Sequence, residues 1–239
     1  MTSLITLSHG SRHPKAVAGI EVLTQRAAAL ADVAHWQCTH LEFNEPDLAT
    51  AAQQLAARGE TEAVVVPLLF TEGYHHRVDV PEAIAAAEEA SGLRLLRGDS
   101  LGTGADMAQV LAQRAGCQPQ CAPMTDHLVI YSVGSSNLQA NQAIARLAVR
   151  VAVLTGVSTS AAFATRGGRE DVAKQARIYG SVRVLPLFVT EGLLLDLLAE
   201  APAYVDSPLG VDLAGIVSHR FAHAAGLPYQ TRQLVQIGR

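Results

Sequence analysis

Two histidines and a glutamate stand where this sequence could bind a metal ion. His9 ends the first apolar run of the chain, Glu42 lies at the end of the second, and His75 follows the third. The interval from His9 to Glu42 equals that from Glu42 to His75. Imidazole and carboxylate ligands together suit a first-row divalent ion. We therefore predict a metal site made of His9, Glu42 and His75, which would also be the catalytic residues.

These three residues meet only if the apolar runs are parallel strands of one sheet. The run 63–66 is apolar throughout, which is typical of a strand buried on both faces. Ligands of open parallel sheets bind beyond the carboxyl ends of the strands. The alternation along the N-terminal half predicts strands at 3–8, 36–43, 62–69 and 93–97, and helices at 15–33, 46–58, 81–90 and 105–115.

The order of these motifs occurs twice in the chain. Segment 8–12 aligns with segment 132–136, and segment 66–73 aligns with 185–192. The fold class that follows is α/β, with two tandem domains that are each a small parallel sheet with helices on both faces. We expect an N-terminal domain at 1–115 that carries the active site, a linker at 116–127, and a C-terminal domain at 128–239. In that second domain the pattern predicts strands at 128–132, 157–163 and 182–188, and helices at 137–152, 168–179, 191–200 and 209–225.

The second copy lacks the candidate ligands. Val133 stands in place of His9, Leu194 in place of His75, and the position of Glu42 falls near Ala161 or Ala162. The repeat therefore predicts one working site, in the N-terminal half.

Composition narrows the class of protein. The chain has 239 residues, of which 49% are hydrophobic and 17% charged, with a net charge of -4. This balance is typical of a globular protein and does not favour nucleic-acid binding. No basic segment precedes the first apolar run, and the uncharged stretch 151–165 is too short and polar to span a bilayer. We predict a cytoplasmic protein without membrane or nucleic-acid partners. The three cysteines, Cys38, Cys117 and Cys121, do not suggest a disulfide scaffold.

Several blocks together resemble the sirohydrochlorin chelatases, the class II chelatases of the CbiX/SirB type, in their long two-domain form. The blocks are His9-Gly10-Ser11-Arg12, segment 42–46, segment 67–70, Gly73-Tyr74-His75 and Asp79-Val80-Pro81. The resemblance implies a chelatase-like fold and a lyase that inserts Fe2+ or Co2+ into sirohydrochlorin, in sirohaem or cobalamin biosynthesis. It implies that ATP and organic cofactors are not used, the metal being a substrate. It assigns the metal to His9 and His75, and it leaves Glu42 as a metal ligand or a proton acceptor.

The implied substrate is a polycarboxylate macrocycle, whose acidic arms need hydrogen-bond donors. Ser11, Arg12, His76 and Arg77 lie beside the proposed ligands and are the candidate substrate-binding residues. The amides after Gly10 are further candidate donors at a helix start. The two arginines could equally be solvated surface charges. A fused pair of domains would act as a monomer with an internal pseudo-dimer.

Two other functions are open on the sequence. A metal carrier or tetrapyrrole-binding protein would use the same residues without catalysis. A hydrolase using Ser8 or Ser11 is less favoured, because neither serine lies in a Gly-x-Ser-x-Gly elbow. The ligand types do not distinguish iron from cobalt. Asp79 is expected to cap the helix that begins at Pro81.

Overall fold

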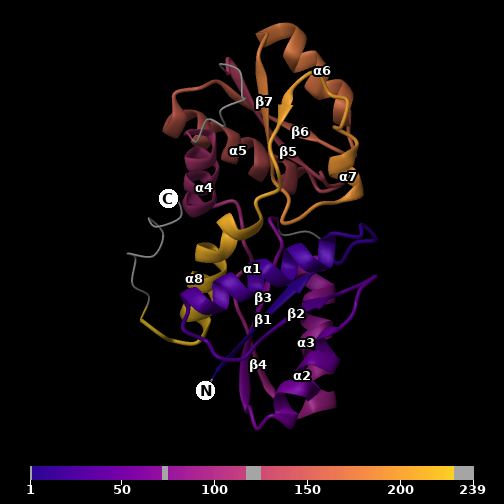
Figure 1. Cartoon of the computed structure of the whole chain (residues 1–239), viewed down its shortest axis with the longest axis vertical. Helices are drawn as coiled ribbons and strands as arrows, with labels where there is room; N and C mark the ends of the chain where they lie inside the picture. The colour runs from indigo at the N-terminus through magenta and orange to yellow at the C-terminus, as the bar shows by residue number, and fades with distance from the viewer. Residues whose placement is uncertain (1, 72–74, 117–124, 229–239) are drawn as a thin grey trace. The chain divides into compact units, whose positions relative to one another are not determined.

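Two parallel four-stranded sheets form the framework of the chain (Figure 1). A computed structural model describes residues 2–71, 75–116 and 125–228. The strand order is β2-β1-β3-β4 in the first sheet and β6-β5-β7-β8 in the second, so the two halves repeat one topology. This confirms the predicted α/β fold class with two tandem sheets.

Helices cover both faces of the first sheet because its strands are apolar on both sides. Ile5 and Leu7 pack with helices α2 and α3, whereas Leu4 points to the opposite face with α1 and α8. Alternate residues of a strand point to opposite faces, which gives β1 two buried surfaces. The elements are β1 (Ser3–Ser8), α1 (Ala16–Leu30), β2 (Trp36–His40), α2 (Leu48–Ala57), β3 (Glu62–Pro67), α3 (Val80–Ser91) and β4 (Arg94–Arg97). A π-helix, η1 (His75–Asp79), precedes α3.

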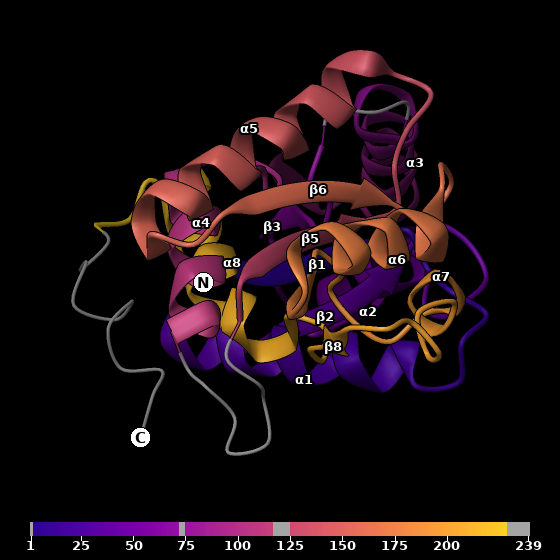
Figure 2. The same ribbon diagram turned by 90° about the horizontal axis from the view of Figure 1, so that it is seen from above.

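The second sheet is built in the same way. Val129 and Tyr131 pack with Val172 of α6 and Leu195 of α7 on one face. Figure 2 shows α5 and α4 together and α6 close to β6, in agreement with the contacts of these helices. The elements are β5 (His127–Ser132), α5 (Leu138–Thr155), β6 (Thr159–Phe163), α6 (Gly168–Tyr179), β7 (Val182–Pro186), α7 (Leu193–Asp196) and β8 (Tyr204–Val205).

Each compact unit includes a helix from the other half of the sequence. The described residues up to Gly102 group with those from Gly210 onward, and the second unit spans Thr103–Leu209. Helix α4 (Ala105–Gly116) therefore packs on α5 of the second unit. The 3-10 helix η2 (Gly210–Leu213) and helix α8 (Ala214–Ala224) pack on α1 of the first. The domain division predicted from the repeat, at 116–127, stays a prediction.

Several predicted element boundaries are wrong, each for a local reason. The second strand ends at His40 and not at Phe43, because the backbone turns at Phe43. The leucine-rich helix predicted at 191–200 is only α7, four residues long, with turns after it. The two-residue strand β8 was not predicted, since so short an element has no periodicity.

The repeat extends to individual backbone hydrogen bonds. In the first unit Leu41 and Glu42 donate to the carbonyl oxygens of Ser8 and His9, at 2.9 and 3.0 Å. In the second, Ala164 and Thr165 donate to those of Ser132 and Val133, at 2.8 and 3.0 Å. Thr165 is thus the counterpart of Glu42, and the sequence alignment that placed it near Ala161 or Ala162 is wrong. The loop between β2 and α2 is longer than the loop between β6 and α6. An alignment with a fixed offset between the two halves therefore misplaces the residue that matches Glu42.

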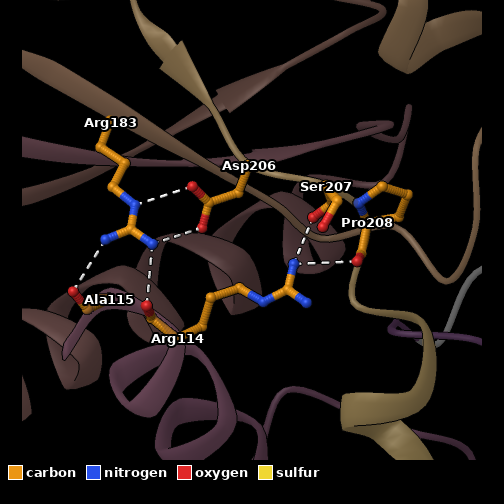
Figure 3. Close-up of polar contacts among 6 residues, drawn as sticks. All are labelled: Arg114, Ala115, Arg183, Asp206, Ser207 and Pro208. Carbon is orange, nitrogen blue, oxygen red and sulfur yellow. Dashed lines mark hydrogen bonds and ion pairs between the residues drawn. The ribbon is translucent and has the colours of Figure 1, made fainter. Parts of the chain in front are cut away.

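A buried ion pair fixes the carboxyl end of α4 within the second unit (Figure 3). The Arg183 guanidinium donates to both carboxylate oxygens of Asp206, each at 2.9 Å, and these side chains are 4% and 6% exposed. The same guanidinium donates to the carbonyl oxygens of Arg114 and Ala115, both at 3.0 Å. Arg114 in turn donates to the carbonyl oxygens of Ser207 and Pro208. Arg183 thereby satisfies carbonyl groups that the end of an α-helix leaves without partners.

Substituting Arg183 by methionine should lower the free energy of unfolding by about 3–5 kcal/mol, because the buried carboxylate of Asp206 loses its counter-ion. Urea unfolding followed by circular dichroism measures this. Arg169→Met is the matched control, because Arg169 forms an exposed ion pair with Glu200. This substitution should change the free energy of unfolding by no more than about 1 kcal/mol. Equal losses in the two variants would contradict the role of the buried pair.

Two histidines are almost completely buried in the sheets. His40 is 2% exposed, and its Nδ1 lies 2.7 Å from Ser8 Oγ. His127 is 1% exposed and lies within 3.0 Å of Ser158 Oγ and 2.8 Å of Ser160 Oγ, with its ring stacked on Tyr179 at 3.9 Å. Burial lowers the pKa of both imidazoles below the usual value of 6.5.

Stability should therefore fall as the pH drops below about 6.5, because the unfolded chain takes up protons at these histidines before the folded chain does. His40→Phe should reduce the loss in the free energy of unfolding between about pH 7.5 and about pH 5.5. Phenylalanine is a suitable replacement, because Phe163 pairs with Ser132 as His40 pairs with Ser8. Urea unfolding at the two pH values tests this, and an unchanged fall in the variant would show that His40 is not responsible.

Candidate functional site

The first two predicted ligands lie side by side at the carboxyl edge of the first sheet. His9 is the first residue after β1, and Glu42 follows β2 by two positions. The parallel pairing of β1 with β2 continues past both strand ends, because the Glu42 amide donates to the carbonyl oxygen of His9 at 3.0 Å. His9 is partly buried, whereas the Glu42 side chain is exposed. The structure therefore places the backbones of His9 and Glu42 side by side, and their role as joint ligands stays a prediction.

Gly10 allows this close approach. Its φ is +92°, and a Cβ atom there would lie 1.8 Å from the carbonyl oxygen of Glu42. Any other residue would force the two backbone segments apart. The glycine after His9 is therefore needed for the geometry of the site.

A tight turn at Phe43 follows Glu42. The Asn44 amide donates to the Glu42 carbonyl oxygen at 2.9 Å, across a three-residue turn in which Phe43 has a φ of +66°. Asn44 Oδ1 then accepts a hydrogen bond from the Ser11 amide at 2.8 Å. The Ser11 backbone N–H, expected from the sequence to be a donor to a substrate carboxylate, is thus already engaged. The turn ties the loop after β1 to the loop after β2.

Arg12 and His9 both contact the ring of Phe43. The Arg12 guanidinium carbon lies 4.8 Å from the ring centroid, in the position of a cation–π contact. The His9 imidazole meets the ring edge-on, with centroids 6.0 Å apart and planes at 87°. A cationic side chain and a candidate metal ligand are therefore held on one aromatic ring. The Ser11 hydroxyl accepts from the His13 amide at 3.1 Å, within the same loop.

The third predicted ligand lies in a segment that the structure describes only in part. His75 and His76 belong to the backbone of η1, but their side chains are outside the described residues. Arg77, in the same helix, is exposed. Asp79 was expected to cap α3, but it has helical backbone angles and makes no side-chain capping hydrogen bond. Cys117 and Cys121 also lie outside the described residues.

The chemistry available at this edge is that of one imidazole and one carboxylate, with arginine close by. In the ranges that the structure describes, no group of three or more His, Cys, Asp or Glu side chains is placed to hold a metal ion. The side chain of His75 lies outside these ranges, and the set of three ligands stays a prediction. An open site with few protein ligands suits a metal that must be passed on.

Sequence reasoning missed three residues of this edge. His40 is buried beneath it and bonded to Ser8, Asn44 joins the two loops, and Phe43 contacts His9 and Arg12. The signals in the sequence are weak, since a histidine near a strand end and an asparagine two residues before a proline are both common. The left-handed backbone of Phe43 has no signal in its residue type.

The corresponding edge of the second sheet carries different side chains. Val133, the counterpart of His9, is 43% exposed, and Thr165, the counterpart of Glu42, donates its hydroxyl to the Val133 carbonyl oxygen at 2.9 Å. Gly134 has a φ of +87°, like Gly10. The backbone is repeated here without the imidazole and the carboxylate.

Among the described helices, none is both long and apolar enough to cross a bilayer.

Known proteins match part of the chain. The model of the CbiX family matches residues 3–117. Over 74 residues, or 31% of this chain, the sequence is 35% identical to a sirohydrochlorin cobaltochelatase of Sulfurisphaera tokodaii, of which the match covers 59%. Over 81 residues it is 36% identical to a sirohydrochlorin cobaltochelatase of Saccharolobus solfataricus, with 63% of that protein covered. The match thus spans about three fifths of the length of these relatives.

Solved structures share the fold over nearly the whole chain. The sirohydrochlorin chelatase SirB of Bacillus subtilis subspecies spizizenii, in complex with cobalt, is similar with a TM-score of 0.68 and 22% identity, over 94% of each chain. A CbiX described as the terminal enzyme of siroheme biosynthesis in denitrifying bacteria is similar with a TM-score of 0.67 and 22% identity, over 94% of this chain and 99% of that one. Residues 3–117, which include His9, Glu42 and His75, thus match the model of the CbiX family, and nearly the whole chain shares its fold with chelatases of the SirB and CbiX type.

Proposed function

We propose that this protein is a chelatase that inserts Fe2+ or Co2+ into sirohydrochlorin. The observation that carries the proposal is the hydrogen-bonded pairing of His9 with Glu42, at one sheet edge within the segment that matches the CbiX family. Two relatives that the sequence matches in part are sirohydrochlorin cobaltochelatases. The metal and the macrocycle are both substrates, and the reaction uses no nucleotide.

The reaction exchanges two protons for one metal ion. A divalent ion gives up bound water, forms bonds to the four ring nitrogens, and displaces the protons of the two pyrrole N–H groups. In the proposal His9 and His75 bind the incoming ion, and Glu42 either joins them or accepts a proton. Glu42 is suited to proton transfer because its side chain is exposed and can pass a proton to water, and its backbone is paired with that of His9.

The acidic arms of the macrocycle would be bound by the cations of the same edge. Arg12 lies next to His9 in space through Phe43, and Arg77 lies exposed in η1. We keep Ser11 and His76 as further candidates, with the Ser11 hydroxyl rather than its amide as the available group. A monomeric state and a cytoplasmic location stay predictions of the sequence.

The first prediction concerns insertion itself. Anaerobic mixing of the protein with sirohydrochlorin and Fe2+, and separately Co2+, should change the absorption spectrum faster than in buffer. His9→Ala should abolish most of this acceleration, because the ion loses a ligand. Val133→Ala is the matched control at the equivalent position of the second unit, and it should keep the wild-type rate. Metal or macrocycle binding without acceleration would instead indicate a carrier protein.

Glu42→Gln separates the two roles left open for that residue. We expect kcat to fall by about 100-fold or more, since a general base is lost, while Co2+ still binds with nearly wild-type affinity. Stopped-flow absorption gives kcat, and titration of the Co2+ absorption bands gives the affinity. A large loss of Co2+ affinity would make Glu42 a metal ligand, and an unchanged kcat would remove it from the reaction.

A further inference from the structure

Phe43 is in a conformation that its residue type disfavours. Its φ is +66°, and in the described ranges the only other residue besides glycine with positive φ is Asp32. Asparagine and aspartate adopt this region more readily than bulky residues do. The Phe43 side chain is also 52% exposed, so burial in a core does not compensate for the strain. Strained residues of this kind concentrate where a site must hold a side chain in one place.

The second unit shows that the fold does not require this strain. It makes the same two backbone hydrogen bonds at its strand ends, with Arg166 at the position of Phe43. The Arg166 amide donates to the Phe163 carbonyl oxygen at 3.0 Å, in a wider turn, and Arg166 has no positive φ. The tight turn is therefore specific to the unit that carries His9 and Glu42.

The turn places the Phe43 ring between two residues of the proposed site. One contact is the Arg12 guanidinium over the ring at 4.8 Å, and the other is the edge-on His9 imidazole at 6.0 Å. The Arg12 side chain is exposed and would otherwise sample many rotamers. The ring holds the guanidinium on the same side chain that His9 contacts, where a carboxylate arm of a bound macrocycle would meet it.

We infer that Phe43 is a positioning residue that orders Arg12 for a carboxylate of the substrate. The inference depends on the proposed function for the identity of that substrate. A side chain that is already ordered in the free protein loses less conformational entropy when the substrate binds. Phe43 should therefore act on the affinity for the macrocycle.

The test uses Phe43→Gly, which removes the ring and relieves the backbone. We expect the Kd for metal-free sirohydrochlorin, measured by absorption titration, to rise about fivefold, as does the KM for it in the insertion assay. The melting temperature should stay equal or rise, because glycine accepts a positive φ. Phe43→Trp keeps an aromatic face and should retain most of the affinity. The Kd for sirohydrochlorin should be the same in Arg12→Ala and in the double variant Arg12→Ala, Phe43→Gly, since the ring acts through Arg12.

Asp32→Gly is the matched control for relief of backbone strain. Asp32 lies after α1 at the amino edge of the sheet, away from His9, and its substitution should leave the Kd unchanged. A wild-type Kd for Phe43→Gly, or losses that add in the double variant, would overturn the inference. A fall in melting temperature that parallels the loss of affinity would also overturn it, by making Phe43 structural. If the wild type binds the macrocycle but inserts no metal, the proposed reaction fails while the Kd values still decide the role of Phe43.

Discussion

The hydrogen bond between the Glu42 amide and the His9 carbonyl oxygen determines the rest of the site. It extends a parallel strand pair by two residues, to the point where both side chains leave the sheet. This extension is possible only because Gly10 has no Cβ atom against the Glu42 carbonyl group. The Asn44 side chain then joins the two loops through the Ser11 amide. A rigid sheet edge thus holds the backbones of His9 and Glu42 in a fixed relation, which a loop alone would not provide.

The repeat separates what the fold needs from what the site needs. Both units use a glycine with positive φ after the first strand, and both continue the strand pairing by two hydrogen bonds. They differ in the side chains placed there: His9, Glu42 and Phe43 in one, Val133, Thr165 and Arg166 in the other. Because the backbone of the second unit forms without these side chains, the strained turn and the exposed carboxylate of the first unit are not required for folding.

The exchange of helices adds a second constraint on the chain. Helix α4 follows a strand of the first sheet but packs in the second unit, and α8 closes the first unit from the other end of the sequence. The guanidinium of Arg183, paired with Asp206, holds the end of α4 through hydrogen bonds to the carbonyl oxygens of Arg114 and Ala115. Within the first unit, Arg220 of α8 donates to the carbonyl oxygens of Ser100 and Leu101, at 3.0 and 3.2 Å. In each unit an arginine therefore satisfies backbone carbonyl groups next to the exchanged helix.

The sequence by itself determined the alternation of strands and helices, the duplication, and the placement of His9 and Glu42 at one sheet edge. These follow from hydrophobic periodicity and from the rule that parallel strands end together. Only the tertiary structure decided which residue of the second unit matches Glu42, which helix packs in which unit, and that Phe43 lies against His9 and Arg12. Loop lengths, left-handed turns and helix exchange depend on contacts between distant segments. Residue type and spacing do not encode such contacts locally, so a reading of the sequence leaves them open.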